Sequence, residues 1–270
     1  MRGINKVFEA LKNRNEGALV AYIMAGDPDP KLTINIADSL IRGGVDILEL
    51  GIPFSDPIAD GPTIQAAGIR ALKAGTTTKT VLEIAKQIKC AHDTPLVVMT
   101  YYNLIFKMGL DKFFNSAKAS SIDGIIVPDL PIEEASDYRN AASAHDIDTI
   151  FLVAPSTTKE RLSKIVAYSS GFLYLVSHFG VTGAKTVVEN STLDLVKRVL
   201  PFTSERIPLA VGFGVSKPEH VKNLIAAGAN GVIVGSTFID IVAKNLSDKS
   251  KMYIEIEAAA KKLKAATMPH

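Results

Sequence analysis

The chain has 270 residues, which could form one large domain or two small ones. Its composition, 47% hydrophobic and 21% charged, is that of a globular protein able to bury a large core. The net charge is +2 without a lysine or arginine cluster, which argues against a nucleic-acid surface.

No apolar run approaches the roughly 18 residues of a membrane span, and no signal-peptide stretch follows Met1. The single cysteine, Cys90, cannot form an internal disulfide and fits a reducing compartment. We expect a cytoplasmic protein, in which Cys90 is a buried or half-buried helix residue rather than a catalytic thiol.

The first predicted element is a helix over residues 5–13. Eight short apolar runs follow, each predicted to be a strand and each followed by a segment of helix length. These runs cover residues 18–23, 45–50, 95–99, 124–127, 149–153, 172–176, 208–212 and 231–234.

The intervening segments have the periodicity of amphipathic helices. Leu32, Ile36 and Leu40 fall on one face before Gly43, and Val221 with Leu224 repeats the pattern. The alternation predicts an α/β fold, a (β/α)8 TIM barrel with an extra N-terminal helix. No linker divides the chain, so residues 1–270 are predicted to be a single domain. An open doubly wound sheet is the main alternative, but no strand is followed by a G-x-G-x-x-G turn.

Glu49 interrupts an apolar strand, and period-two alternation places it on the same face as Ile47 and Gly51. If that face lies inside the barrel, desolvation raises the pKa of Glu49 and makes it an acid at neutral pH. The alternative is a structural glutamate paired with a basic residue.

The loop after this strand carries Asp56 and Asp60 among three prolines. Asp60 is a candidate second acid-base group, although the residue pattern alone favours a turn residue ahead of a helix at Gly61–Pro62. Asp56 is open to the same two interpretations.

Glycine-rich turns follow the last two strands, at residues 212–216 and 235–237. In many barrels the loops after strands seven and eight bind phosphate through backbone N–H groups and a helix N-terminus. The alternative is that these glycines only relieve steric crowding and that Ser236 is an ordinary helix cap. A third glycine turn, residues 180–183, is a candidate lid or phosphate contact.

Other reaction types find little support. No lysine stands at a strand end, where a Schiff-base aldolase needs one, and the five histidines show no metal-ligand spacing. We therefore expect neither a metal nor a covalent imine, and carbon–carbon chemistry would depend on general acid-base groups.

Residues 48–65, LELGIPFSDPIADGPTIQ, closely resemble the signature of tryptophan synthase alpha subunits. Supporting matches are AGDP at 25–28, YYNL at 101–104, PDLP at 128–131, GVTG at 180–183 and GFG at 212–214. The resemblance covers nearly the whole chain. It implies cleavage of indole-3-glycerol phosphate into indole and glyceraldehyde 3-phosphate.

The resemblance also implies roles for individual residues. Glu49 matches the catalytic acid-base, Asp60 the group that stabilises the positively charged indole, and Tyr174 a tyrosine beside the catalytic carboxylate. The remaining substrate-binding positions are Tyr22, Thr182, Gly183, Phe213, Gly214, Gly235 and Ser236, with Thr182 as a lid residue.

The family works as an alpha2-beta2 complex, whose beta subunit holds pyridoxal phosphate and receives indole through a tunnel. The resemblance therefore implies no cofactor in this chain and a partner contact region at Asp56, Pro57, Asn103, Phe106 and Asp129. For residues 104–106 an ordinary core turn is equally compatible.

Three positions depart from the family pattern. Tyr22 stands where phenylalanine is common, which adds a hydroxyl that needs a partner or water. His178-Phe179 replaces an arginine and a small residue before the GVTG turn. The alternatives for function are another phosphate-binding barrel, such as an isomerase or epimerase, and an inactive barrel that only activates a partner.

Overall fold

The computed structural model describes residues 3–176, 185–203, 206–212 and 214–268. Within them, nine parallel strands form one sheet in the order β5-β4-β3-β2-β1-β9-β8-β7-β6. The strands are β1 (Ala18–Met24), β2 (Ile47–Gly51), β3 (Leu96–Met99), β4 (Gly124–Ile126), β5 (Asp148–Ile150), β6 (Leu152–Val153), β7 (Leu173–Val176), β8 (Leu209–Gly212) and β9 (Gly231–Val234).

The sheet closes into a barrel through its fifth predicted strand. β5 pairs with β4 and β6 pairs with β7, and only Phe151 separates β5 from β6. The Phe151 carbonyl accepts a hydrogen bond from the Tyr174 N–H at 3.0 Å. The predicted run 149–153 is therefore one strand that bends between two neighbours. The predicted barrel is confirmed, and the open doubly wound alternative is wrong.

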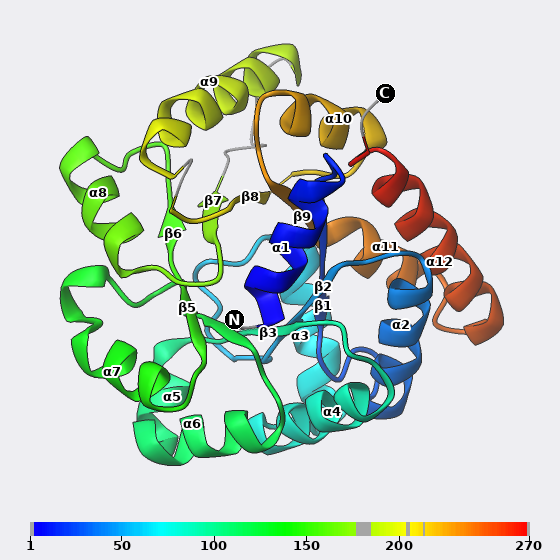
Figure 1. Cartoon of the computed structure of the whole chain (residues 1–270). Coiled ribbons are helices and arrows are strands. Elements are labelled where there is room, and N and C mark those ends of the chain that lie inside the picture. Colours follow the sequence, from blue (N-terminus) through cyan, green and yellow to red (C-terminus); the bar gives the residue numbers. More distant parts are fainter. Residues whose placement is uncertain (1–2, 177–184, 204–205, 213, 269–270) are drawn as a thin grey trace.

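Helices surround the strands, and α1 lies over the middle of the barrel (Figure 1). They are α1 (Gly3–Asn13), α2 (Pro30–Arg42), α3 (Pro62–Lys73), α4 (Thr78–Ala91), α5 (Tyr102–Met108), α6 (Leu110–Ala119), the 3-10 turn η1 (Ile132–Glu134), α7 (Ser136–Ala144), α8 (Lys159–Tyr168), α9 (Lys185–Thr203), α10 (Pro218–Ala226), α11 (Ser236–Lys244) and α12 (Lys249–Ala265).

Cys90 lies in the last turn of α4 but is exposed, so its expected burial was wrong. In the described ranges, no helix is long and apolar enough to cross a membrane.

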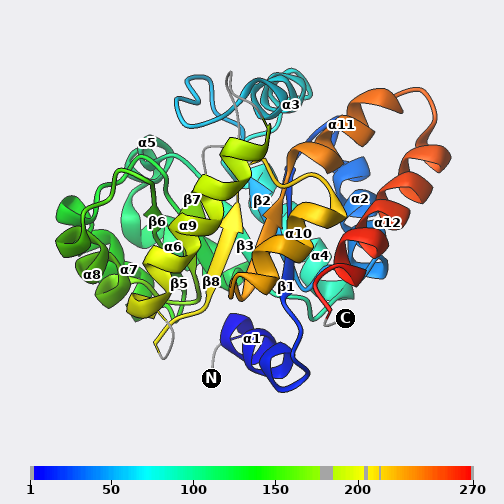
Figure 2. The ribbon, with the colours of Figure 1, turned by 90° about the horizontal axis from the view of Figure 1, so that it is seen from above.

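The extra N-terminal helix is present and covers one end of the barrel. α1 buries Ile4, Phe8 and Leu11, and the Phe8 and Phe172 ring centroids are 5.9 Å apart. α3 lies at the opposite end, where the parallel strands have their carboxyl ends (Figure 2). The amino-terminal end of the barrel is thus sealed by apolar side chains, which leaves the carboxyl end for a site.

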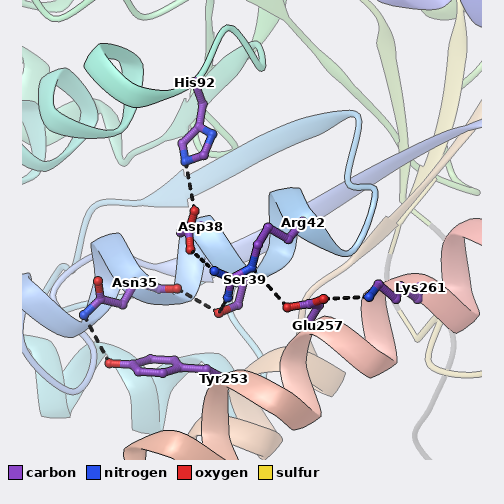
Figure 3. A network of polar contacts seen from close by, with 8 residues as sticks. All are labelled: Asn35, Asp38, Ser39, Arg42, His92, Tyr253, Glu257 and Lys261. Atoms are coloured by element: carbon purple, nitrogen blue, oxygen red, sulfur yellow. Dashed lines mark hydrogen bonds and ion pairs between the residues drawn. The ribbon is translucent and has the colours of Figure 1, made fainter.

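A polar network joins α2 to α12 on the outside of the barrel (Figure 3). Arg42 bridges Asp38, at 2.7 Å, and Glu257, at 3.1 Å, while Asn35 donates to the Tyr253 hydroxyl at 3.2 Å. These pairs are largely exposed and contribute little to stability individually. They lie at the contact between the two helices, where α12 also buries Met252, Ile256 and Ala260.

Candidate active site

The strand alternation predicted for β2 places Glu49 inside the barrel. Ile47, two residues earlier, belongs to the interior cluster that α1 covers, and Glu49 itself is 0% exposed. In the strand register Glu49 pairs with Tyr22 on β1 and with Val97 on β3. Glu49 is therefore a carboxyl group surrounded by the barrel interior, one layer below the carboxyl end of β2.

In the part of the chain that the structure describes, the Glu49 carboxyl group has no basic partner. Neither of its oxygens has a hydrogen-bond partner among the described residues. Burial, and next the nearby charge of Asp60, raise the pKa of Glu49 to about 8. The structural alternative of a glutamate paired with a basic residue is wrong, and a carboxyl group that is protonated at neutral pH is available for proton transfer.

Asp60 lies in the loop between β2 and α3. It precedes Gly61, the N-cap residue of α3, and its N–H donates to the Pro57 carbonyl at 3.1 Å. The turn interpretation thus describes its backbone correctly, but the half-buried side chain lines the cavity that holds Glu49. Burial raises the pKa of Asp60 to about 6, and an interaction with the Tyr101 hydroxyl acts in the opposite direction.

Tyr101 supports the Asp60 loop, a role that was not predicted. The Ala59 N–H donates to the Tyr101 hydroxyl at 3.0 Å, and the Tyr101 ring stacks on Phe54 with the centroids 5.1 Å apart. The only sequence signal was the Tyr101-Tyr102 pair directly after the third strand. Which of the two hydroxyls reaches a loop some forty residues earlier depends on the three-dimensional path of the chain.

Two adjoining cavities open at the carboxyl end of the barrel. One, of about 310 Å³, is lined by Glu49, Tyr22 and the residues of the predicted phosphate turns. The other, of about 510 Å³, is lined mainly by the loops after β4 and β6. They share Asp60, Met99 and Tyr174, so these three side chains stand between two halves of one site.

The ring of Tyr174 fills the space that a glycine on the next strand leaves. A Cβ at Gly212 on β8 would collide with the Tyr174 ring and hydroxyl, so only glycine leaves room for the tyrosine at this layer. Tyr174 is 6% exposed and lines both cavities. The structure thus brings Tyr174 into the same site as Glu49 and Asp60.

The predicted phosphate turns line the smaller cavity. Gly214 has a φ of +79°, Gly235 is the N-cap of α11, and Ser236 is the first residue of that helix. An anion there would meet backbone N–H groups and the positive end of the α11 dipole. The other predicted substrate contacts, Thr182, Gly183 and Phe213, lie outside the described residues, as does His178-Phe179.

The predicted partner contacts lie around the rim of the barrel mouth. Asp56 and Asn103 are exposed, Pro57 is half-buried, and Phe106 is 72% exposed. Asp129 has an internal contact as well, since its carboxylate accepts the Tyr102 N–H at 2.9 Å at the start of α5. Ile58, which was not predicted, is 83% exposed beside Asp56 and Pro57.

A cavity of about 600 Å³ lies at the other end of the barrel, beside α1 and the segments before β7, β8 and β9. Although it is larger, strand amino ends in this fold serve stability rather than chemistry. Among the described residues, no group of three or more His, Cys, Asp or Glu side chains could hold a metal ion.

Together, these features define a (β/α)8-barrel enzyme whose site combines a buried acid with the amino end of a helix. The model of the tryptophan synthase alpha chain family matches residues 8–268. The chain is 48% identical over 258 residues to the tryptophan synthase alpha chain of Methanothermobacter thermautotrophicus, covering 96% of this chain and 95% of that one.

Solved structures agree with the sequence comparison. Tryptophan synthase subunit alpha from Legionella pneumophila superposes with a TM-score of 0.90 at 34% identity, covering 99% and 98% of the two chains. A chain of the Pyrococcus furiosus tryptophan synthase a2b2 complex superposes with a TM-score of 0.84 at 41% identity, covering 92% and 98%. The chain therefore belongs to the tryptophan synthase alpha chain family, whose members are lyases that cleave indole-3-glycerol phosphate.

Proposed function

We propose that this chain splits indole-3-glycerol phosphate into indole and D-glyceraldehyde 3-phosphate, with Glu49 as the acid-base group. The observation that carries the proposal is the Glu49 carboxyl group, fully buried in the cavity and without a partner among the described residues. A buried carboxyl group of this kind is protonated at neutral pH and is ready to donate its proton.

The reaction proceeds as a retro-aldol cleavage. Glu49 donates its proton to the indole ring carbon that bears the glycerol chain, and the ring becomes a cation with its charge on nitrogen. Asp60, an anion above about pH 6, stabilises that cation at the indole N–H.

The Glu49 carboxylate then removes the proton of the adjacent side-chain hydroxyl. The carbon–carbon bond breaks, its electron pair restores the neutral ring, and the hydroxyl carbon becomes the aldehyde. Glu49 ends protonated, as it began. Tyr174 packs beside the reacting atoms, while Gly214, Gly235 and Ser236 bind the phosphate. Thr182, Gly183 and Phe213 remain substrate contacts expected from the family resemblance.

The chain is proposed to act in an alpha2-beta2 complex that passes indole to a beta subunit for tryptophan synthesis. Its support is the a2b2 complex of the Pyrococcus furiosus relative. The predicted contact residues also agree with it, since Asp56, Asn103 and Phe106 are exposed and Pro57 and Asp129 are half-buried. Pyridoxal phosphate is expected in the beta subunit, with no cofactor in this chain. We also propose that residues 1–270 form one domain, because no linker divides the sequence. A cytoplasmic location is proposed because the single cysteine fits a reducing compartment.

The test is the release of both products from indole-3-glycerol phosphate by the purified chain, alone and with a beta subunit. We expect equal amounts of indole and glyceraldehyde 3-phosphate, with faster release when the partner is present. Glu49→Gln should lower kcat by roughly 10²- to 10⁴-fold, the usual contribution of a general acid-base group. Glu83→Gln, the same substitution at an exposed position on α4, is the control.

Neither product under either condition, from a chain with the circular dichroism of a folded barrel, would overturn the proposal. Activation of the beta subunit by such an inactive chain would instead support the partner-only alternative.

A further inference from the structure

Tyr22 brings a phenol hydroxyl group to the site. It lies on β1, in strand register with Glu49, and lines the same cavity of about 310 Å³. The side chain is 5% exposed. Its hydroxyl is therefore an additional polar group inside the site, on the strand next to the acid-base residue.

The Tyr22 hydroxyl has no hydrogen-bond partner among the described residues. The two carboxyl oxygens of Glu49 also have no hydrogen-bond partner among the described residues. Three buried oxygen atoms of residues that line one cavity therefore lack partners. A buried polar atom without a partner lowers stability unless a ligand or an ordered water satisfies it. Such a cluster indicates a place that a polar ligand group fills.

Two glycines fix the direction of the Tyr22 ring. A Cβ at Gly51, at the end of β2, would collide with the Tyr22 hydroxyl. A Cβ at Gly235 would lie 3.1 Å from Cδ1 of the ring. The ring fills the space that both glycines leave, and its hydroxyl is therefore held over the end of β2, directly beyond Glu49.

The hydroxyl in this place is a hydrogen-bond donor. Burial, followed by the charges of Asp60 and Glu49, raises the pKa of Tyr22 well above its ordinary value, so the phenol stays protonated. It can therefore donate a hydrogen bond to an acceptor oxygen of a bound ligand.

We propose that Tyr22 is a specificity-determining residue whose hydroxyl binds a hydroxyl group of the substrate's glycerol chain. This inference depends on the proposed function, because it assumes indole-3-glycerol phosphate as the ligand. Of the substrate's polar groups, the indole N–H is assigned to Asp60 and the phosphate to the end of α11. The two glycerol hydroxyls, one of which loses its proton to Glu49 in the proposed reaction, are the groups left for a donor directly beyond Glu49.

The test compares two ligands that differ only in those hydroxyl groups. Indole-3-glycerol phosphate has both of them, and indole-3-propanol phosphate has neither. Tyr22→Phe should weaken binding of the first ligand, measured as Kd, and lower its kcat/KM by roughly 3- to 10-fold, the effect of one lost hydrogen bond. Its Kd for indole-3-propanol phosphate should change by less than about twofold.

Tyr138→Phe is the matched control. Tyr138 is also buried, but its hydroxyl donates to the Ile125 carbonyl at 3.2 Å, away from the cavity. This variant should leave both Kd values unchanged and lose stability in urea, whereas Tyr22→Phe without ligand should lose none.

Unchanged binding and turnover of indole-3-glycerol phosphate by Tyr22→Phe would overturn the proposal, since the hydroxyl would then serve only a water molecule. An equal loss for both ligands would also overturn it, by assigning the effect to packing against the indole ring. If the unsubstituted chain releases no indole, the proposed function fails, and the two Kd values still decide whether Tyr22 distinguishes the hydroxylated ligand.

Discussion

At the scale of single residues, two carboxyl groups in one site are given different charge states by their surroundings. Glu49 is fully buried, which raises its pKa to about 8, while Asp60 is half-buried beside the Tyr101 hydroxyl and has a pKa of about 6. Between these values Glu49 is an acid and Asp60 an anion. This division suits a reaction that needs a proton donor and a counter-charge at the same time.

The pH dependence of turnover should follow these two groups. Activity requires ionised Asp60 and protonated Glu49, so kcat/KM should fall below about pH 6 and above about pH 8. The Tyr101 interaction lowers the pKa of Asp60, and its removal in Tyr101→Phe should therefore move the acid limb of the profile to higher pH. Tyr253→Phe, on α12, is the control. An acid limb that stays in place in Tyr101→Phe would show that the Tyr101 hydroxyl does not act on the Asp60 carboxyl group.

The sequence was informative about residues that break a local pattern. Glu49 could be predicted because a carboxylate in an apolar strand needs an explanation. Tyr101 could not be assigned its role, because nothing local distinguishes its hydroxyl from that of Tyr102. The residue pattern alone favoured a turn role for Asp60, and only the family resemblance implied that its side chain takes part in the site.

At the scale of elements, α3 is tied to the loop after β1. Arg70 on α3 contacts both carboxylate oxygens of Asp27, at 2.7 and 2.8 Å, and the Asp27 side chain is almost fully buried. α3 begins two residues after Asp60, so this ion pair fixes the helix that follows the catalytic loop. No pattern in the sequence connects Asp27 with a residue 43 positions later.

Removing this pair should destabilise the fold. Arg70→Met leaves the Asp27 carboxyl group buried without its partner, and we expect a loss of roughly 2 to 4 kcal/mol in the free energy of unfolding. The loss stays below that of a fully buried pair because Arg70 is partly exposed and Asp27 can take up a proton. Arg42→Met, in the exposed network between α2 and α12, should cost less than about 1 kcal/mol. Urea unfolding measures both, and equal losses would contradict a special role for the Asp27 pair.

At the scale of the whole molecule, the alternation of strands and helices predicted the barrel correctly. The break between β5 and β6 could not be predicted, since the bend at Phe151 arises from pairing with β4 on one side and β7 on the other. The packing of the last helix was also unpredictable. The Lys264 ammonium group of α12 donates to the Gly17 carbonyl at 3.2 Å and to the Asp46 carboxylate at 2.9 Å, and it thereby joins segments far apart in the chain.

Closure of the barrel has a direct chemical consequence. α1 seals the amino end with apolar side chains, and the strands exclude water from the Glu49 layer. The charged form of a carboxyl group is disfavoured there, so burial in the barrel keeps Glu49 protonated and able to donate its proton. The proposed reaction depends on this protonation.

The most direct measurement is the infrared difference spectrum between the chain and its Glu49→Gln variant, recorded from pH 6 to pH 10. At pH 7 we expect the carbonyl band of a protonated carboxyl group, which is absent from the variant and disappears as the pH rises through about 8. A spectrum in which Glu49 is already a carboxylate at pH 6 and 7 would contradict this expectation.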